Sequence, residues 1–362
     1  MAHALQLARR GLYSTPPNPS VGCVIVASDG RVVGEGHHER AGEPHAEVFA
    51  LRQAGAAARG ATAYVSLEPC AHFGRTPPCA EALLEAGLGR VVAAMRDPNP
   101  RVNGGGLTRL AAAGVATADG LLAGEAREIN RGFVSRMTHG RPWVTLKVAA
   151  SLDGRTALAN GASKWITGDP ARSDVQRLRA RASAIVTGSG TVLADDPSLT
   201  VRDPSLEMRG RQPLRVVFDS GLRLPTTAKL VTDGGPTLVF TTAASLASRG
   251  AALQSAGVAL EPLVSRGNGL DLAAGLERLA RLECNEVLLE AGPTLAGAFV
   301  AAGLVDEVIA YVAATVLGDA ARPMLCLPLL ENMSERPRFG WVDARPVGGD
   351  LRLTLRPIQE AK

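Results

Sequence analysis

The sequence predicts an α/β protein of two domains, and three observations carry that prediction. Strand-like and helix-like runs alternate along most of the 362 residues, a pattern typical of sheets covered by helices. A chain of this length exceeds one average domain. The alternation breaks at a polar, turn-rich stretch at 130–142, which we expect to be irregular. We therefore expect one domain at residues 1–140 and a second at 141–362.

The first domain has the following expected elements. The stretch MAHALQLARRGLYS has the pattern of an amphipathic helix and lacks the apolar core of a signal peptide. Strand-like runs VGCVIVAS and RVVGEG flank an Asp-Gly turn at 29–30. They are followed by a helix in HAEVFALRQAGAAA, a strand in ATAYVSLE, a short helix in CAEALLEAGL and a buried strand in RVVAAM. These runs predict a sheet with largely covered strands.

The second domain begins with the strong strand pattern WVTLKVAASLDG. Further strands are expected in SAIVTG, LRVVFDS, TLVFTT, VALEPLV, EVLLEAG, DEVIAYVA and LRLTLRP. Helical runs lie between several of them, including ARSDVQRLRARA and TLAGAFVAAGL, and the stretches at 202–213 and near 265 resemble surface loops. The basic run RLRARA is expected to be a solvated helix face.

Composition narrows the classes of function. Apolar content of 46% and charged content of 20% describe an ordinary globular protein. The net charge of +4 suits an anionic small molecule such as a phosphate ester, and it also suits no special partner. Aromatic residues make up 4%, which argues against single-stranded nucleic acid as a ligand. No apolar run in the sequence is long enough to cross a bilayer, so we expect no membrane partner. The scattered cysteines and the lack of a signal-peptide core make the reducing cytoplasm the expected location.

Two of the five cysteines, Cys70 and Cys79, lie on one loop, LEPCAHFGRTPPC. They could form a disulfide, act as redox thiols, bind a metal or be small buried apolar residues. The odd number and wide scatter of the cysteines do not resemble a secreted disulfide framework. In a reducing compartment, a close pair is more often metal-binding or catalytic. Cys284 and Cys326 have no motif around them and are expected to be inert core residues.

A histidine upstream completes a possible metal site. His45, in GEPHAEV at 42–48, could join Cys70 and Cys79 in binding zinc through one nitrogen and two sulfurs. Three protein ligands leave a tetrahedral position for water, as in catalytic sites, and zinc lowers the pKa of that water. Glu47 would then lie in the first turn of a helix, beside the metal, as a proton shuttle. A structural zinc would instead need a fourth ligand, for which the sequence offers His37, His38 and His72.

The motifs around these residues resemble those of a known family. Zinc nucleobase deaminases carry H-x-E followed by P-C-x-x-C, whereas here eight residues separate the cysteines. This long form, with NPSVG at 18–22 and GEPHAEV, resembles the deaminase half of bifunctional riboflavin-biosynthesis deaminase/reductases. The resemblance continues through KVAASLDGRTA, SKWIT, GTVLADDPSLTVR and EAGPTLAGA, and so covers nearly the whole chain. It implies a cytidine-deaminase-like three-layer α/β/α domain, then a dihydrofolate-reductase-like α/β domain.

The resemblance also implies an activity and its residues. The first half would remove an exocyclic amine from a phosphoribosylaminopyrimidine, with zinc on His45, Cys70 and Cys79 and with Glu47 moving the proton. Asn18 looks like a ring contact, although a turn-forming asparagine explains it equally well. His72 could touch substrate or stabilise its loop. A homo-oligomer is expected from the resemblance alone.

The second half would reduce the ribosyl group to ribityl with NADPH. Unaided, the sequence shows there only a strand, a Gly-Pro turn and a helix, whose free amides would suit a phosphate; such a unit is also common as plain structure. By resemblance, NADPH would meet Ala149, Trp165, Thr191, Asp195, Ser220, Gly292, Pro293, Thr294, Leu295, Ala296, Gly297 and Ala298. The substrate would meet Ser163, Arg179, Leu199, Arg202 and Glu290. Asp195 or Lys147 could assist the proton that accompanies hydride addition.

Two other functions fit parts of the sequence. The chain could be a deaminase of RNA or of free nucleosides, with the second half as an accessory; the scarcity of aromatic residues and the reductase-like motifs weigh against this. It could also be a non-catalytic, zinc-stabilised binding module, which would have no need of Glu47.

Overall fold

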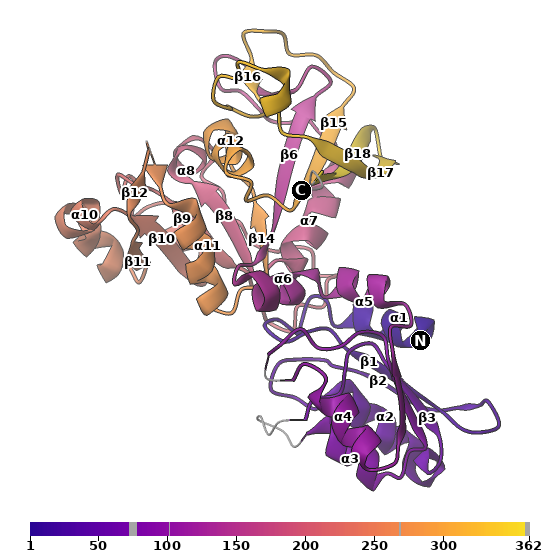
Figure 1. The fold of residues 1–362 in the computed structure, drawn as a ribbon. Coiled ribbons are helices and arrows are strands. Elements are labelled where there is room, and N and C mark those ends of the chain that lie inside the picture. The colour runs from indigo at the N-terminus through magenta and orange to yellow at the C-terminus, as the bar shows by residue number, and fades with distance from the viewer. Residues whose placement is uncertain (72–77, 101, 268, 359–362) are drawn as a thin grey trace. The chain divides into compact units, whose positions relative to one another are not determined.

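The computed structural model describes residues 1–71, 78–100, 102–267 and 269–358. It divides into two compact units, Met1–Arg141 with Glu207–Arg209, and Pro142–Leu206 with Gly210–Lys362. Figure 1 shows each unit as a sheet with helices packed on it. No helix within the described ranges is long and apolar enough to span a membrane.

The first unit is built on a five-stranded sheet in the order β2-β1-β3-β4-β5. β1 is antiparallel to both neighbours, and β3, β4 and β5 run parallel. The strands are β1 Gly22–Val26, β2 Val32–His37, β3 Thr62–Val65, β4 Arg90–Ala93 and β5 Ala116–Asp119. The helices are α1 Ala2–Arg10, α2 Ala46–Ala54, η1 Gly55–Ala58, α3 Cys79–Glu85, α4 Gly105–Ala112, α5 Ala123–Ile129 and α6 Arg131–His139.

Alternating side chains on β1 show why this unit has three layers. Cys23 and Ile25 pack with Ala46 and Ala50 of α2 on one face of the sheet. Val24 packs with α1 on the other face. Because successive strand residues point to opposite faces, an apolar β1 needs helices on both sides. The predicted α/β/α sandwich is therefore confirmed.

The second unit contains a nine-stranded sheet in the order β11-β10-β9-β8-β14-β6-β15-β18-β17. Seven strands, from β11 to β15 in that order, are parallel, and β18 is antiparallel to both of its neighbours. The strands are β6 Trp143–Ser151, β8 Ala184–Gly188, β9 Leu214–Phe218, β10 Thr237–Thr241, β11 Ala259–Pro262, β14 Glu286–Leu289, β15 Glu307–Ala313, β17 Phe339–Val347 and β18 Asp350–Pro357. Short pairs are formed by β7 Arg155–Ala157 with β16 Arg322–Pro323, and by β12 Ser265–Arg266 with β13 Gly269–Leu270.

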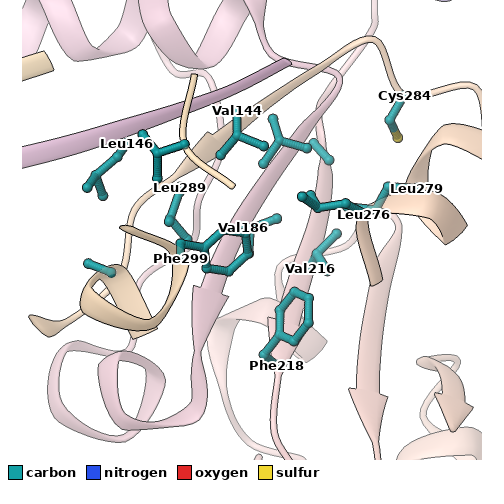
Figure 2. Close-up of a cluster of buried hydrophobic side chains, with 14 of the residues drawn as sticks. Val144, Leu146, Val186, Val216, Phe218, Leu276, Leu279, Cys284, Leu289 and Phe299 are labelled. Atoms are coloured by element: carbon teal, nitrogen blue, oxygen red, sulfur yellow. The ribbon is translucent and has the colours of Figure 1, made fainter. Parts of the chain in front are cut away.

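Helices cover both faces of this sheet. They are α7 Asp169–Arg181, α8 Ser189–Asp195, α9 Lys229–Thr232, α10 Ala243–Ser255, α11 Leu272–Arg281, α12 Pro293–Ala301 and the 3-10 turn η2 Met333–Glu335. Figure 2 shows Val186 and Val216 of the sheet beside Phe299 of α12 and Leu276 of α11. Val217, the next residue along β9, points to the opposite face of the sheet and packs in a second cluster with side chains of α9 and α10. Each such buried apolar side chain stabilises the fold by roughly 1.5–3 kcal/mol.

The structure corrects two expectations. The stretch at 130–142, expected to be irregular, contains the helix α6, whose Gly132, Phe133 and Ser135 are buried. One buried stripe is enough to hold a short helix, even in a polar sequence. Cys326, expected in the core, is exposed, whereas Cys284 is buried as expected.

Candidate functional site

Three ligand atoms from three separate segments converge in the first unit. His45 is the N-cap residue of α2, Cys79 is the first residue of α3, and Cys70 follows the end of β3. His45 Nδ1 lies 3.1 Å from Cys79 Sγ and 3.7 Å from Cys70 Sγ. The Nδ1 or Nε2 of His45 and the two Sγ atoms all lie within 4.8 Å of one another, close enough to bind one metal ion.

The electrostatics of the two thiols match a cation site. The pKa of the Cys70 thiol is lowered to about 4, chiefly by the hydrogen bond from the Cys79 thiol and further by His45. Donating that hydrogen bond raises the pKa of Cys79. The backbone N–H of Cys79 also donates to Cys70 Sγ at 3.3 Å. The cysteines are free rather than bridged, and an N,S,S donor set with a ready thiolate suits zinc.

Glu47 is a buried carboxyl beside these ligands. It lies in the first turn of α2 and is 3% exposed. Burial raises its pKa, and the neighbouring His45 opposes that shift. Its Oε2 has no hydrogen-bond partner among the described residues. An unpartnered buried oxygen next to a metal-ligating cluster fits a site that receives a water and a substrate.

Asn18 and His38 form a second layer around His45. His38 Nδ1 lies 3.1 Å from the Pro44 carbonyl oxygen, and His38 Nε2 lies 3.0 Å from Asn18 Nδ2. Both ring nitrogens are therefore occupied, which argues against His38 as a fourth metal ligand. His37, the last residue of β2, does not belong to the ligand group of His45, Cys70 and Cys79. His72, a candidate for that role or for a substrate contact, falls outside the described residues.

Glu68 is a residue that the sequence did not single out. Its buried carboxylate accepts hydrogen bonds from the backbone N–H groups of Asp97, Gly104, Gly106 and Leu107. These bonds fix the start of α4 beside the Pro69–Cys70 segment. The glycine-rich run NGGG at 103–106 was the available signal, because so many glycines before a helix indicate a close approach of backbones.

In the second unit, a cavity of about 1510 Å³ lies at the carboxyl ends of the parallel strands. Parallel α/β sheets commonly bind ligands at this edge. Fifteen of the seventeen residues predicted for the reductase site line it: Ala149, Ser163, Trp165, Arg179, Thr191, Asp195, Leu199, Arg202, Ser220, Glu290, Gly292, Pro293, Thr294, Leu295 and Ala298.

The other two predicted residues face away from the cavity. Ala296 is fully buried in the apolar core, and a Cβ on Gly297 would lie 2.0 Å from the Cys326 carbonyl oxygen. Close packing against the Cys326 backbone therefore explains why residue 297 is a glycine. A helix that presents one face to the cavity turns the residues on its opposite face into the core.

A charged cluster lies at the centre of the cavity. Arg179 donates to both carboxylate oxygens of Glu290, at 2.6 and 3.0 Å. Burial alone would raise the pKa of Glu290, but Arg179 and Lys147 lower it overall. Burial lowers the pKa of the Lys147 ammonium, and Glu290 opposes that change. The arrangement keeps a carboxylate in a buried place by surrounding it with cations.

Two further contacts shape the cavity wall. The N–H of Gly292, the N-cap residue of α12, donates to Thr191 Oγ1 at 3.0 Å, so the starts of α8 and α12 are tied together. Trp165 is 70% exposed, and the Arg172 guanidinium lies 4.5 Å from its ring centroid. The tryptophan is therefore a wall of the cavity rather than a core residue.

Family models match both units. The cytidine and deoxycytidylate deaminase zinc-binding region matches residues 1–95, and the RibD C-terminal domain matches residues 142–351. The chain is 50% identical to the riboflavin biosynthesis protein RibD of Escherichia coli K12, over 98% of each chain. It is 47% identical to the RibD protein of Haemophilus influenzae Rd, over 99% of this chain and 96% of the relative.

Solved structures of RibD proteins are similar to this chain in both sequence and fold. Acinetobacter baumannii RibD, form 1, is 48% identical and has a TM-score of 0.92, covering 99% of this chain and 98% of that one. A deaminase/reductase from Thermotoga maritima is 33% identical, with a TM-score of 0.86 over 99% of this chain and 97% of that one.

Fold, site and matches together define a two-domain enzyme with a zinc-binding deaminase region and a reductase domain. The chain belongs to the RibD family of riboflavin biosynthesis proteins. It is a bifunctional enzyme of that pathway, a zinc-dependent deaminase and an NADPH-dependent reductase.

Proposed function

We propose that residues 1–140 hydrolyse the 2-amino group of 2,5-diamino-6-(5-phosphoribosylamino)pyrimidin-4-one, and that residues 141–362 then reduce the product's ribosyl group to ribityl with NADPH. The observation that carries the first half is the convergence of His45, Cys70 and Cys79 beside the buried carboxyl of Glu47, whose Oε2 has no hydrogen-bond partner among the described residues. The second half is supported by the cavity around Arg179 and Glu290.

In the deaminase half, His45, Cys70 and Cys79 would hold zinc, which would supply Lewis-acid activation of the attacking water near neutral pH. Glu47 takes up the proton of that water and returns it to the departing amine. Burial raises the pKa of this carboxyl, which suits a group that must hold a proton and then release it. Asn18, fixed by His38, contacts the pyrimidine ring.

In the reductase half, NADPH supplies the hydride. The residues that bind it are those of the predicted cofactor set that line the cavity, with the N–H groups of Thr294 and Leu295 in the first turn of α12 available to its phosphates. Arg202 binds the ribose phosphate, a group that guanidinium recognises with two parallel hydrogen bonds. Ser163 and Glu290 bond the sugar hydroxyls or the pyrimidine edge. Lys147 or Asp195 supplies the proton that accompanies hydride addition to C1.

One experiment tests both halves. The full chain is incubated with the diaminopyrimidine ribotide, with and without NADPH, and the products are followed by mass spectrometry. Loss of ammonia without NADPH, followed by a gain of two hydrogens only with it, is the expected result. Deamination of cytidine or RNA instead would favour the alternative nucleoside or RNA deaminase. If zinc is bound without any turnover, the protein is a binding module.

The surroundings of the enzyme are also proposed. Five free cysteines and the lack of a spanning helix in the described ranges support a cytoplasmic location. A homo-oligomer is proposed from family likeness, and light scattering of the purified protein tests it: a mass of 37.5 kDa would contradict it.

A further inference from the structure

Arg202 stands on an irregular segment of the second unit. Residues 196–203 belong to no helix or strand. The Arg202 side chain is exposed and lines the reductase cavity, and its guanidinium makes no hydrogen bond or ion pair with the described residues. A long side chain on irregular backbone loses much conformational entropy when it binds a ligand, unless the backbone that carries it is already held. The neighbouring side chains supply that restraint.

Gln212 binds the residue before Arg202 in the way that a neighbouring strand would. Its Oε1 accepts a hydrogen bond from the Val201 N–H at 2.9 Å, and its Nε2 donates to the Val201 carbonyl oxygen at 3.0 Å. One side-chain amide thereby satisfies both backbone polar groups of one residue. Gln212 is restrained in turn, because the N–H of Leu214, at the start of β9, donates to the Ser183 carbonyl oxygen at 2.9 Å.

Helix α7 holds the backbone on either side of that residue. Gln176 Oε1 accepts a hydrogen bond from the Arg202 N–H at 2.8 Å, and Arg179 Nη1 donates to the Thr200 carbonyl oxygen at 3.2 Å. Gln176 and Arg179 are three residues apart on the helix, so they lie on the same face. The three consecutive residues 200–202 are therefore held through their backbone by side chains from two separate segments.

We propose that Gln212 and Gln176 are positioning residues, which hold Arg202 in place for the ribose phosphate of the reductase substrate. The inference rests on the proposed function, in which Arg202 binds that phosphate. Gln176 itself lines the cavity, whereas Gln212 does not. Gln212 can therefore affect substrate binding only through the segment that it holds, and its removal is the cleaner test.

The test measures reduction of 5-amino-6-(5-phosphoribosylamino)uracil by the full chain with NADPH. In Gln212→Ala we expect KM for this ribotide to rise by about three- to tenfold, the size of about one neutral hydrogen bond. The kcat value should stay within about twofold, because the phosphate is held equally in the ground state and in the transition state.

A double-mutant cycle shows whether the effect passes through Arg202. Arg202→Ala alone should raise KM for the ribotide by about tenfold or more, the size of one charge-assisted hydrogen bond. In that background Gln212→Ala should add less than about twofold, because no guanidinium is left to position. The substrate without its phosphate, the aminouracil riboside, gives an independent measurement: wild type and Gln212→Ala should reduce it with equal kcat/KM.

A matched control is Ser205→Ala. Ser205 Oγ donates to Asp203 Oδ1 at 2.6 Å, and its backbone N–H donates to the same oxygen at 2.9 Å. This side chain is close to Arg202 in the sequence, but its hydrogen bond goes to Asp203 rather than to residues 200–202. Its removal should leave KM for the ribotide unchanged.

The outcomes separate this proposal from the function on which it rests. A wild-type chain that reduces neither ribotide nor riboside overturns the reductase assignment, and one that reduces both with equal kcat/KM overturns the role of Arg202 in binding the phosphate. A wild-type chain that prefers the ribotide, with an unchanged KM in Gln212→Ala, overturns the positioning role alone.

Two further results would also overturn the positioning role. One is a full rise of KM on adding Gln212→Ala to Arg202→Ala, and the other is an equal loss of kcat/KM with the riboside, because each marks a general defect of the loop. Should Gln212→Ala fail to fold, Gln176→Leu, measured with and without Arg202→Ala and with both substrates, decides in the same way.

Discussion

Arg179 and Glu290 are joined by two hydrogen bonds, at 2.6 and 3.0 Å, in the cavity of the reductase unit. Each side chain is 11% exposed. Because both residues also line the cavity with Lys147, the pair fixes the orientation of two groups proposed to meet the substrate. A substrate hydroxyl or ring N–H therefore meets a carboxylate that is already held in place, which reduces the entropy lost on binding.

Removing the charge of Glu290 should damage both stability and reduction. In Glu290→Gln, Arg179 and Lys147 are left without a buried counter-charge, which we expect to cost about 3 kcal/mol of folding free energy and to abolish measurable reduction. Deamination should persist. Thermal unfolding and NADPH oxidation with supplied aminouracil ribotide measure the two effects.

The control for that variant is Glu286→Gln. Glu286 accepts two hydrogen bonds from Arg181, at 2.8 and 2.9 Å, and does not line the cavity. It should lose stability but keep its kcat for reduction. Equal loss of reduction in both variants would show that the effect of Glu290 comes from stability alone.

Glu47→Gln should stop deamination and leave zinc in place. The amide keeps the shape of the side chain but cannot take up a proton, so we expect kcat to fall by about 10²- to 10⁴-fold. Zinc content by mass spectrometry and reduction of supplied aminouracil ribotide should match wild type. Glu81→Gln is a suitable control, since Glu81 lies two residues after Cys79 but pairs with Arg109 at the surface. Full deamination by Glu47→Gln would refute the proton shuttle.

The sequence predicted that His45, Cys70 and Cys79 come together, and the structure shows this convergence; local rules account for part of the prediction. His45 could be placed at the start of a helix, and Glu47 in its first turn, from apolar spacing alone, and α2 confirms this. The long gap between Cys70 and Cys79 was informative only because it matched a family.

Contacts between distant segments could not be predicted in the same way. Nothing near Glu68 indicates that its carboxylate caps a helix more than thirty residues later. Similarly, Arg179 and Glu290 were each expected to bind substrate, but their mutual pairing depends on how α7 and β14 pack. Helix α6 was missed because one buried stripe in a polar stretch gives a weak periodic signal.

Gly106→Ala should disturb the deaminase site through the backbone. A Cβ at this position would lie 1.8 Å from the carbonyl oxygen of Pro69, the residue before Cys70. The start of α4 and the Cys70 segment must then move apart, which we expect to cost about 1–3 kcal/mol and to weaken zinc binding. Gly105→Ala is the matched control, because its Cβ would meet only Ala71 Cβ, at 3.8 Å. Competition with a chromogenic chelator measures zinc affinity; equal affinities in the two variants would contradict the prediction.

Asp97 gives the first unit a pH dependence whose sign can be stated. Burial raises the pKa of this carboxyl to about 6, so the folded state favours its neutral form. Its contribution to stability is fully present below the unfolded pKa near 3.9, and it is lost as pH rises through about 6. Asp97→Asn removes the ionisation and can keep the hydrogen bond that Asp97 Oδ1 accepts from the Asn99 N–H.

We therefore expect Asp97→Asn to be more stable than wild type at pH 8, by roughly 2 kcal/mol, with the difference shrinking toward pH 4.5. All three tryptophans, at 143, 165 and 341, lie in the second unit, so their fluorescence does not report on the first unit. Unfolding of the first unit in urea is therefore measured by hydrogen exchange of the amides in α2 and β1. For Asp29→Asn we expect a stability change of the opposite sign. Backbone and side-chain hydrogen bonds from Arg31 lower the pKa of Asp29, so this variant should be less stable than wild type above pH 4. A difference between Asp97→Asn and wild type that does not change from pH 4.5 to 8 would show that Asp97 stays ionised in the folded protein.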